Sequence, residues 1–191
     1  MSTKTDIVNF LKTNPFIARL NFGFLSYKVY PTAYQKDVAD AISSGEIKLG
    51  NGLSPGAGAT YYSDYDRLEL SSSFTIGNSR DQGFLIHECT HAHLDIQRLG
   101  SHSAHENEAV GYLAEAVFLE AQGAAPLGSE AIRVVSRRIA KSIMSGTYLV
   151  PATDTAALVA EVSSNPHYSS KALYISNGFN RSLVNQILRD L

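Results

Sequence analysis

Residues 84–93, FLIHECTHAH, decide how the rest of this 191-residue sequence is interpreted. Three apolar residues open the stretch, and the pattern from residue 80 onward is helical. His87 and His91 are four residues apart, so on a helix they lie on one face, one turn from each other. Two imidazoles in that relation can bind one Zn²⁺ at about 2.0–2.1 Å. The alternative is a core helix with two histidines on its polar face.

Glu88 follows His87 directly and therefore lies about 100° around the helix axis from it. Its carboxylate cannot easily join the same pair of ligands, but it can reach a water held by the metal. In an HExxH pattern the two histidines bind zinc and the glutamate acts as general base. We therefore predict a metal site on this helix.

A catalytic zinc needs a third protein ligand and one open position. The metzincin pattern would place glycine and histidine three and six residues after His91, where this chain has Leu94 and Gln97. Peptide deformylases use a cysteine well before the motif, whereas Cys89, the only cysteine, lies inside it and is expected to be a small buried residue. What remains is a glutamate from the next helix.

The next helix is predicted to begin at the capping box SAHE, residues 103–106, with Gly100 closing the helix before it. Glu108 and Glu115 share a face but lie about 10 Å apart along the axis, so only one of them can reach the metal. Early fraying of the first helix near Asp95 favours Glu108, and a longer helix favours Glu115. The acidic candidates on this segment are Glu106, Glu108, Glu115 and Glu120.

The order of predicted elements indicates one α+β domain over residues 1–191, β-rich over about 1–78 and helical over about 79–191. Before the motif we expect a helix at 6–12, a strand at 22–30, a helix opened by Pro31, a strand around 47–49, a glycine-rich loop at 50–58 and a β-hairpin built from 59–63 and 67–71. From the motif onward we expect helices at about 80–98, 104–122, 129–145, 154–163 and 179–190.

Composition narrows the function classes. A net charge of −2 favours neither nucleic acid nor an anionic membrane as partner, and no apolar run is long enough to span a bilayer. A single cysteine allows no internal disulfide. The N-terminal sequence lacks the apolar region of a secretory signal, so we expect a soluble, cytoplasmic protein, with export by another route left open. The oligomeric state is not predicted.

Two further groups of charged residues are expected to be exposed to solvent. Asp95, one turn past His91, is expected to solvate the end of the active-site helix. A basic series on the helix at 129–145 is expected to form a solvated face, and consists of Arg133, Arg137, Arg138 and Lys141.

The HECTH pattern at 87–91, followed by Asn-Glu-Ala at 107–109, resembles the gluzincin class of zinc metallopeptidases, particularly its minimal single-domain members. The resemblance covers roughly residues 59–122 and implies a zincin-like fold that hydrolyses peptide or protein substrates. It implies Glu88 as general base and Zn²⁺ held by His87, His91 and Glu108. A catalytically silent binding module of the same fold is the alternative.

The class also implies an edge strand along which an extended substrate adds, here 59–62 or 68–70. Members often have a downstream residue that stabilises the oxyanion, and the candidates of the right type are His167, Tyr168 and Tyr148. The chain departs from the thermolysin-like pattern at Tyr112, where that pattern has an acidic residue four positions after the third ligand.

Overall fold

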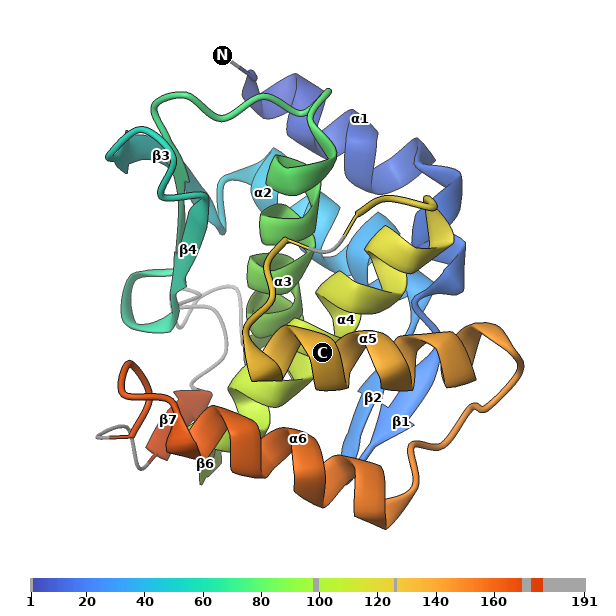
Figure 1. The fold of residues 1–191 in the computed structure, drawn as a ribbon. Coiled ribbons are helices and arrows are strands. Elements are labelled where there is room, and N and C mark those ends of the chain that lie inside the picture. Colours follow the sequence, from blue (N-terminus) through green and yellow to red (C-terminus); the bar gives the residue numbers. More distant parts are fainter. Residues whose placement is uncertain (1, 98–99, 126, 170–172, 177–191) are drawn as a thin grey trace, which may run out of the picture.

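The computed structural model describes residues 2–97, 100–125, 127–169 and 173–176, and shows a mixed α+β fold in which helices predominate (Figure 1). Short sheets and several helices share the N-terminal half, and the C-terminal half is mainly helical. The coarse α+β prediction is therefore confirmed. Within the described part of the chain, every helix is too short or too polar to cross a bilayer.

The N-terminal segment contains helices as well as strands. Helix α1 (Lys4–Thr13) begins at a capping box between Thr3 and Asp6, and the 3₁₀ helix η1 (Pro15–Arg19) follows it. The predicted strand at 22–30 is instead a hairpin of β1 (Phe22–Phe24) and β2 (Tyr27–Val29), because Leu25 adopts a φ of 53° and reverses the chain. The helix after Pro31 is present as a π-helix, η2 (Ala33–Val38), continued by α2 (Ala39–Ser44).

A three-stranded sheet comes next, in the order β3-β5-β4. Strand β3 (Lys48–Leu53) runs parallel to β5 (Arg67–Ser71), and it extends into the stretch that was expected to be only a glycine-rich loop. Strand β4 (Ala59–Tyr62) pairs antiparallel with β5 across the short 3₁₀ turn η3 (Ser63–Tyr65), as the predicted hairpin required. Among the described residues, β4 pairs with a strand on one side, and its other edge faces α3, where the Tyr61 N–H donates to Glu88.

Two long helices follow the sheet, and their bounds lie within two residues of those predicted. Helix α3 (Ser79–Ile96) begins at the N-cap Asn78, and α4 (Ala104–Ala121) begins at Ser103, whose side chain accepts the N–H of Glu106. The connection between them contains a strand that was not predicted, β6 (Gly100–Ser103), which pairs with β7 (Leu173–Ser176). Helices α5 (Ala131–Met144) and α6 (Ala152–Ser164) complete the described fold. The helix predicted at 179–190 lies outside the described residues.

Helix α3 lies at the centre of the molecule, with the sheet on one side and α4 on the other (Figure 1). Its residues Leu85, Ile86 and Cys89 are fully buried in one core cluster that draws residues from both halves of the chain. Cys89 is thus the small buried residue that was expected. Of the polar side chains that α3 places between β4 and α4, His87 and His91 are largely shielded from water.

Candidate metal centre

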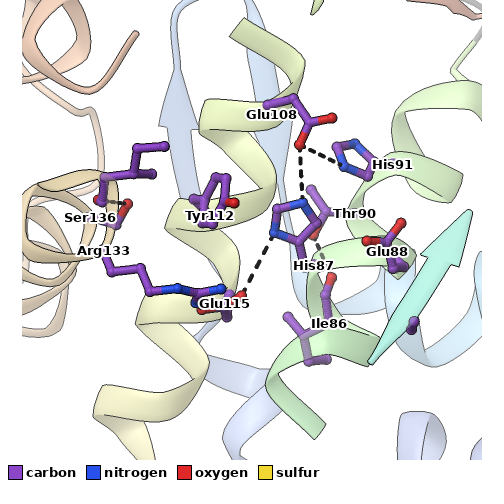
Figure 2. Close-up of polar contacts among 12 residues, drawn as sticks. Ile86, His87, Glu88, Thr90, His91, Glu108, Tyr112, Glu115, Arg133 and Ser136 are labelled. Carbon is purple, nitrogen blue, oxygen red and sulfur yellow. Dashed lines mark hydrogen bonds and ion pairs between the residues drawn. The ribbon is translucent and has the colours of Figure 1, made fainter. Parts of the chain in front are cut away.

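His87, His91 and Glu108 come together between α3 and α4 (Figure 2). Each offers one ligand atom, and these atoms all lie within 4.8 Å of one another. The Glu108 Oε2 atom is 3.4 Å from His87 Nε2 and 3.7 Å from His91 Nε2. Both histidines are buried, while Glu108 is partly exposed. The structure therefore brings together the three residues that the sequence proposed as ligands.

These separations can be compared with those around a tetrahedral ion. Zinc bonds of about 2.0–2.1 Å at tetrahedral angles place neighbouring ligand atoms about 3.4 Å apart. The distances from Glu108 Oε2 to the two histidine nitrogens match that edge closely. Two imidazoles and one carboxylate are also a donor set that zinc commonly takes in catalytic sites. By donor chemistry and spacing, the three residues fit a zinc ion with one position left for water or substrate.

Helix α4 is shaped to receive the ring of His87. A Cβ atom at Gly111 would lie 2.9 Å from His87 Nε2, closer than side chains normally pack, so the ring rests directly on the α4 backbone. Glu108, Gly111 and Glu115 are spaced so that they share one face of α4. Gly111 thereby lets α3 and α4 approach closely enough for Glu108 to reach both histidines. This glycine was not predicted to belong to the site, although its spacing from Glu108 and Glu115 is a signal present in the sequence.

Glu115, the alternative third ligand, is not part of the three-residue group. It lies on the opposite side of the His87 ring, with its Oε2 atom 3.8 Å from Nδ1, and it forms an ion pair with Arg133 of α5 (Figure 2). The structural reason is the length of α3, which ends at Ile96, so that Glu108 rather than Glu115 is level with the histidines. This is the outcome that early termination near Asp95 was expected to favour.

The predicted role of the basic helix face was wrong for Arg133. Its side chain is only 14 % exposed, and its guanidinium lies over the rings of Phe84 and Tyr112 as well as beside Glu115. Arg137 and Arg138, by contrast, are more exposed and pair with Glu120 and Asp154 respectively. A helical spacing of cations could not distinguish the one that turns inward.

Glu88 lies partly buried beside the ligand group and does not belong to it. Its Oε2 atom accepts the backbone N–H of Tyr61 in β4 at 2.7 Å. Burial raises the pKa of Glu88 to about 7, an effect that Glu108 strengthens and His87 opposes. A carboxyl whose pKa lies near neutrality is well suited to take up and release a proton.

Negative charge dominates the surroundings of His87. Burial by itself lowers the pKa of this histidine, but the hydrogen bond to Glu108 and the charges of Glu88, Glu108 and Glu115 outweigh it, and the pKa is raised. Three carboxylates thus act on one ring, and Glu115 is the member that pairs with Arg133. A buried group with this excess of negative charge favours a divalent cation.

The site opens into a cleft of about 520 Å³ between β4 and the C-terminal part of the described chain. Tyr168 lines this cleft, where its phenol and that of Tyr112 form a hydrogen bond of 2.9 Å. His167 lines it too. Tyr148 does not: it is 52 % exposed and its carbonyl accepts the backbone N–H of Gly23, so it is removed from the candidates for oxyanion stabilisation.

Asp95 contradicts the expectation that it would solvate the end of the helix. It is fully buried, and it accepts a hydrogen bond of 2.9 Å from the Tyr61 phenol. Tyr61 therefore contacts α3 twice, through its backbone at Glu88 and through its side chain at Asp95. Nothing local in the sequence indicated this pairing, because the two partners are 34 residues apart.

Comparison with known protein families, curated proteins and solved structures finds no significant match.

Proposed function

We propose that this protein is a zinc-dependent peptidase of the zincin type, with the ligand arrangement of a minimal gluzincin. The observation that carries the proposal is the meeting of His87, His91 and Glu108, whose ligand atoms lie within 4.8 Å of one another, with a partly buried Glu88 beside them. A structural zinc site would have four protein ligands, whereas three ligands and an adjoining cleft are typical of a catalytic one.

The proposed roles follow from where the side chains lie. His87, His91 and Glu108 hold Zn²⁺, which when bound lowers the pKa of a coordinated water and polarises a carbonyl. Glu88 accepts the proton from the attacking water and later passes it to the amine that leaves. Without the ion, burial raises the pKa of this carboxyl to about 7, which is in the range suited to proton transfer near neutral pH.

The substrate is proposed to bind along strand β4. Gly58 accepts the N–H of Ser71, which makes Thr60 and Tyr62 the residues of β4 whose backbone bonds face β5. The backbone of Tyr61 consequently faces the other way, and its N–H points to Glu88 in the cleft. An extended peptide lying along this edge would place its backbone beside the general base. Tyr168, across the cleft, is the proposed donor to the oxyanion.

The test is a comparison of zinc content and peptide cleavage in three proteins. The parent should bind one zinc and cleave unfolded casein or a quenched-fluorescence peptide library. Glu88→Gln should keep the zinc and lose at least about 10²-fold in rate, because it removes the base and no ligand. His87→Ala should lose both.

Two results would overturn the proposal in different ways. Cleavage by Glu88→Gln at the parent's rate would reject this carboxyl as the base. Stoichiometric zinc in a parent that cleaves nothing in the library would reject the peptidase, and would leave a metal-binding module of the same fold.

A further inference from the structure

The imidazole of His87 lies between two carboxylates of the same helix. Glu108 faces Nε2 at 3.4 Å, and Glu115 faces Nδ1 at 3.8 Å (Figure 2). The two glutamates are about 10 Å apart along α4, with Gly111 between them, and the ring spans the space over that glycine. Each ring nitrogen therefore has its own acidic neighbour, and the two neighbours differ in what else they contact.

Glu108 also contacts His91 and is partly exposed, as a ligand at the edge of a cleft would be. Glu115 is 3 % exposed, and its Oε2 atom has no hydrogen-bond partner among the described residues. A buried carboxylate oxygen without a hydrogen-bond partner destabilises the fold. The His87 Nδ1 atom lies 3.8 Å from this oxygen, about 1 Å beyond hydrogen-bond distance.

Arg133 makes it possible to bury this carboxylate. Its guanidinium pairs with Glu115 Oε1, and the rings of Phe84 and Tyr112 lie 5.9 and 5.2 Å from the guanidinium carbon. A buried carboxylate is tolerated when a fixed cation compensates its charge, and the aromatic contacts hold this cation in place. One oxygen of Glu115 is thus committed to Arg133, which leaves Oε2 for His87.

We propose that Glu115 is a positioning residue that accepts the Nδ1–H of His87 and so fixes the ring with Nε2 directed at the metal position. The proposal builds on the zinc site of the proposed function. Histidine ligands generally donate their second ring N–H to a carboxylate, carbonyl or water, and losing that partner weakens metal affinity by about 10–100-fold. In this chain the partner stands seven residues after the carboxylate ligand, and Tyr112 occupies the position four residues after it.

The experiment measures the zinc dissociation constant of the full chain by competition with a chelating dye. Glu115→Ala should bind one zinc about 10–100-fold more weakly than the parent. Glu115→Gln keeps an oxygen that can accept the Nδ1–H, so it should recover part of that loss. If Glu115→Ala weakened zinc binding only by disturbing the packing, Glu115→Gln would not be expected to recover affinity. Glu115→Gln also keeps the proposal testable if Glu115→Ala does not fold. The visible spectrum of the Co²⁺-loaded protein should shift in Glu115→Ala, because the field at a ligand has changed.

Glu120→Gln is the matched control. Glu120 lies on the same helix and also pairs with an arginine of α5, Arg137, at 3.0 Å, but it does not line the cleft that holds the ligands. It should bind zinc as the parent does. Parent-like zinc affinity in Glu115→Ala and Glu115→Gln would overturn the positioning role and leave the peptidase proposal intact. Complete loss of zinc in Glu115→Gln, with zinc retained in Glu108→Gln, would make Glu115 the ligand instead. A parent that binds no zinc would overturn both proposals.

Discussion

The phenol of Tyr61 donates a hydrogen bond of 2.9 Å to the buried carboxyl group of Asp95. The first residue belongs to the edge strand β4 and the second to the last turn of α3, the helix that carries both histidines. The backbone N–H of Tyr61 also donates to Glu88, seven residues earlier on α3. Strand β4 and helix α3 are therefore joined by hydrogen bonds at two points. Both elements line the cleft, so these bonds fix the position of one side of the cleft relative to the other.

Tyr61→Phe should lower the free energy of unfolding by about 1.5–3 kcal/mol, because it removes a hydrogen bond to a buried carboxyl group and adds nothing in exchange. Urea denaturation followed by circular dichroism measures the change. Tyr62→Phe is the control, since that neighbouring tyrosine is 42 % exposed and should change stability by less than about 0.5 kcal/mol. Equal stability of the two variants would show that the Asp95 contact contributes nothing.

Glu88 should make the metal-free protein less stable as the pH rises. Burial raises its pKa from 4.5 in the unfolded chain to about 7 in the folded protein. The folded state therefore binds the proton more tightly, and the stability that comes with the neutral carboxyl is complete below pH 4.5 and is lost as the pH rises through 7. Glu88→Gln keeps a neutral side chain at every pH.

In a chelating buffer, Glu88→Gln should thus melt at a higher temperature than the parent at pH 8 and at nearly the same temperature at pH 5. Calorimetry at the two values measures the difference. If Glu88→Gln were less stable than the parent at pH 8, the ionised carboxylate of Glu88 would not destabilise the fold. The position would then be no evidence for a group held ready for catalysis.

Zinc should stabilise the protein through ligands that join two helices. His87 and His91 lie on α3 and Glu108 on α4, so the set forms only in the folded chain. Free zinc at 1,000 times its dissociation constant should add about 4 kcal/mol, and excess chelator should remove that gain. Glu108→Gln should show little of the shift. Glu106→Gln should keep it, because Glu106 lies two residues earlier on α4 and contacts Tyr27 rather than the ligand histidines. A full zinc shift in Glu108→Gln would exclude Glu108 as a ligand.

Features that depend on residues close together in the sequence could be predicted, and features that depend on contacts between distant segments could not. Helices α3 and α4 were predicted within two residues because the N-cap Ser103 and the apolar patterns of both helices are local signals. The spacing of His87 and His91 on one helix face was likewise local. The choice between Glu108 and Glu115 was not, since it depends on where α3 ends and how the connection returns, and that connection contains the unpredicted strand β6.

Other features depended on contacts between distant segments. The inward turn of Arg133 requires a buried partner, Glu115, on another helix, and a series of cations on one face gives no sign of it. Asp95 was assigned to solvent because its partner, Tyr61, precedes it by 34 residues. The segment 22–30 was predicted as one strand but forms a hairpin, because Leu25 adopts a left-handed conformation that is uncommon for leucine. Tertiary packing decided each of these positions.

Gly111→Ala should separate the stability of the fold from the binding of metal. Alanine is favoured over glycine by about 1 kcal/mol in the interior of a helix, so α4 itself gains from the change. The new methyl group, however, would lie 2.9 Å from His87 Nε2 and 3.0 Å from its Cε1, and the ring must move away from α4. The metal-free protein should therefore unfold at a similar or higher denaturant concentration, while its zinc affinity falls by about tenfold or more, as expected for a displaced ligand.

Gly77→Ala is the control, because a Cβ atom at Gly77, just before α3, would have no atom within 4 Å and so touches neither a ligand nor Glu115. It should keep the zinc affinity of the parent, measured by the same chelator competition. If Gly111→Ala bound zinc as tightly as Gly77→Ala, the His87 ring would have room to move without losing the ion. The close approach of α3 to α4 would then have no part in forming the site.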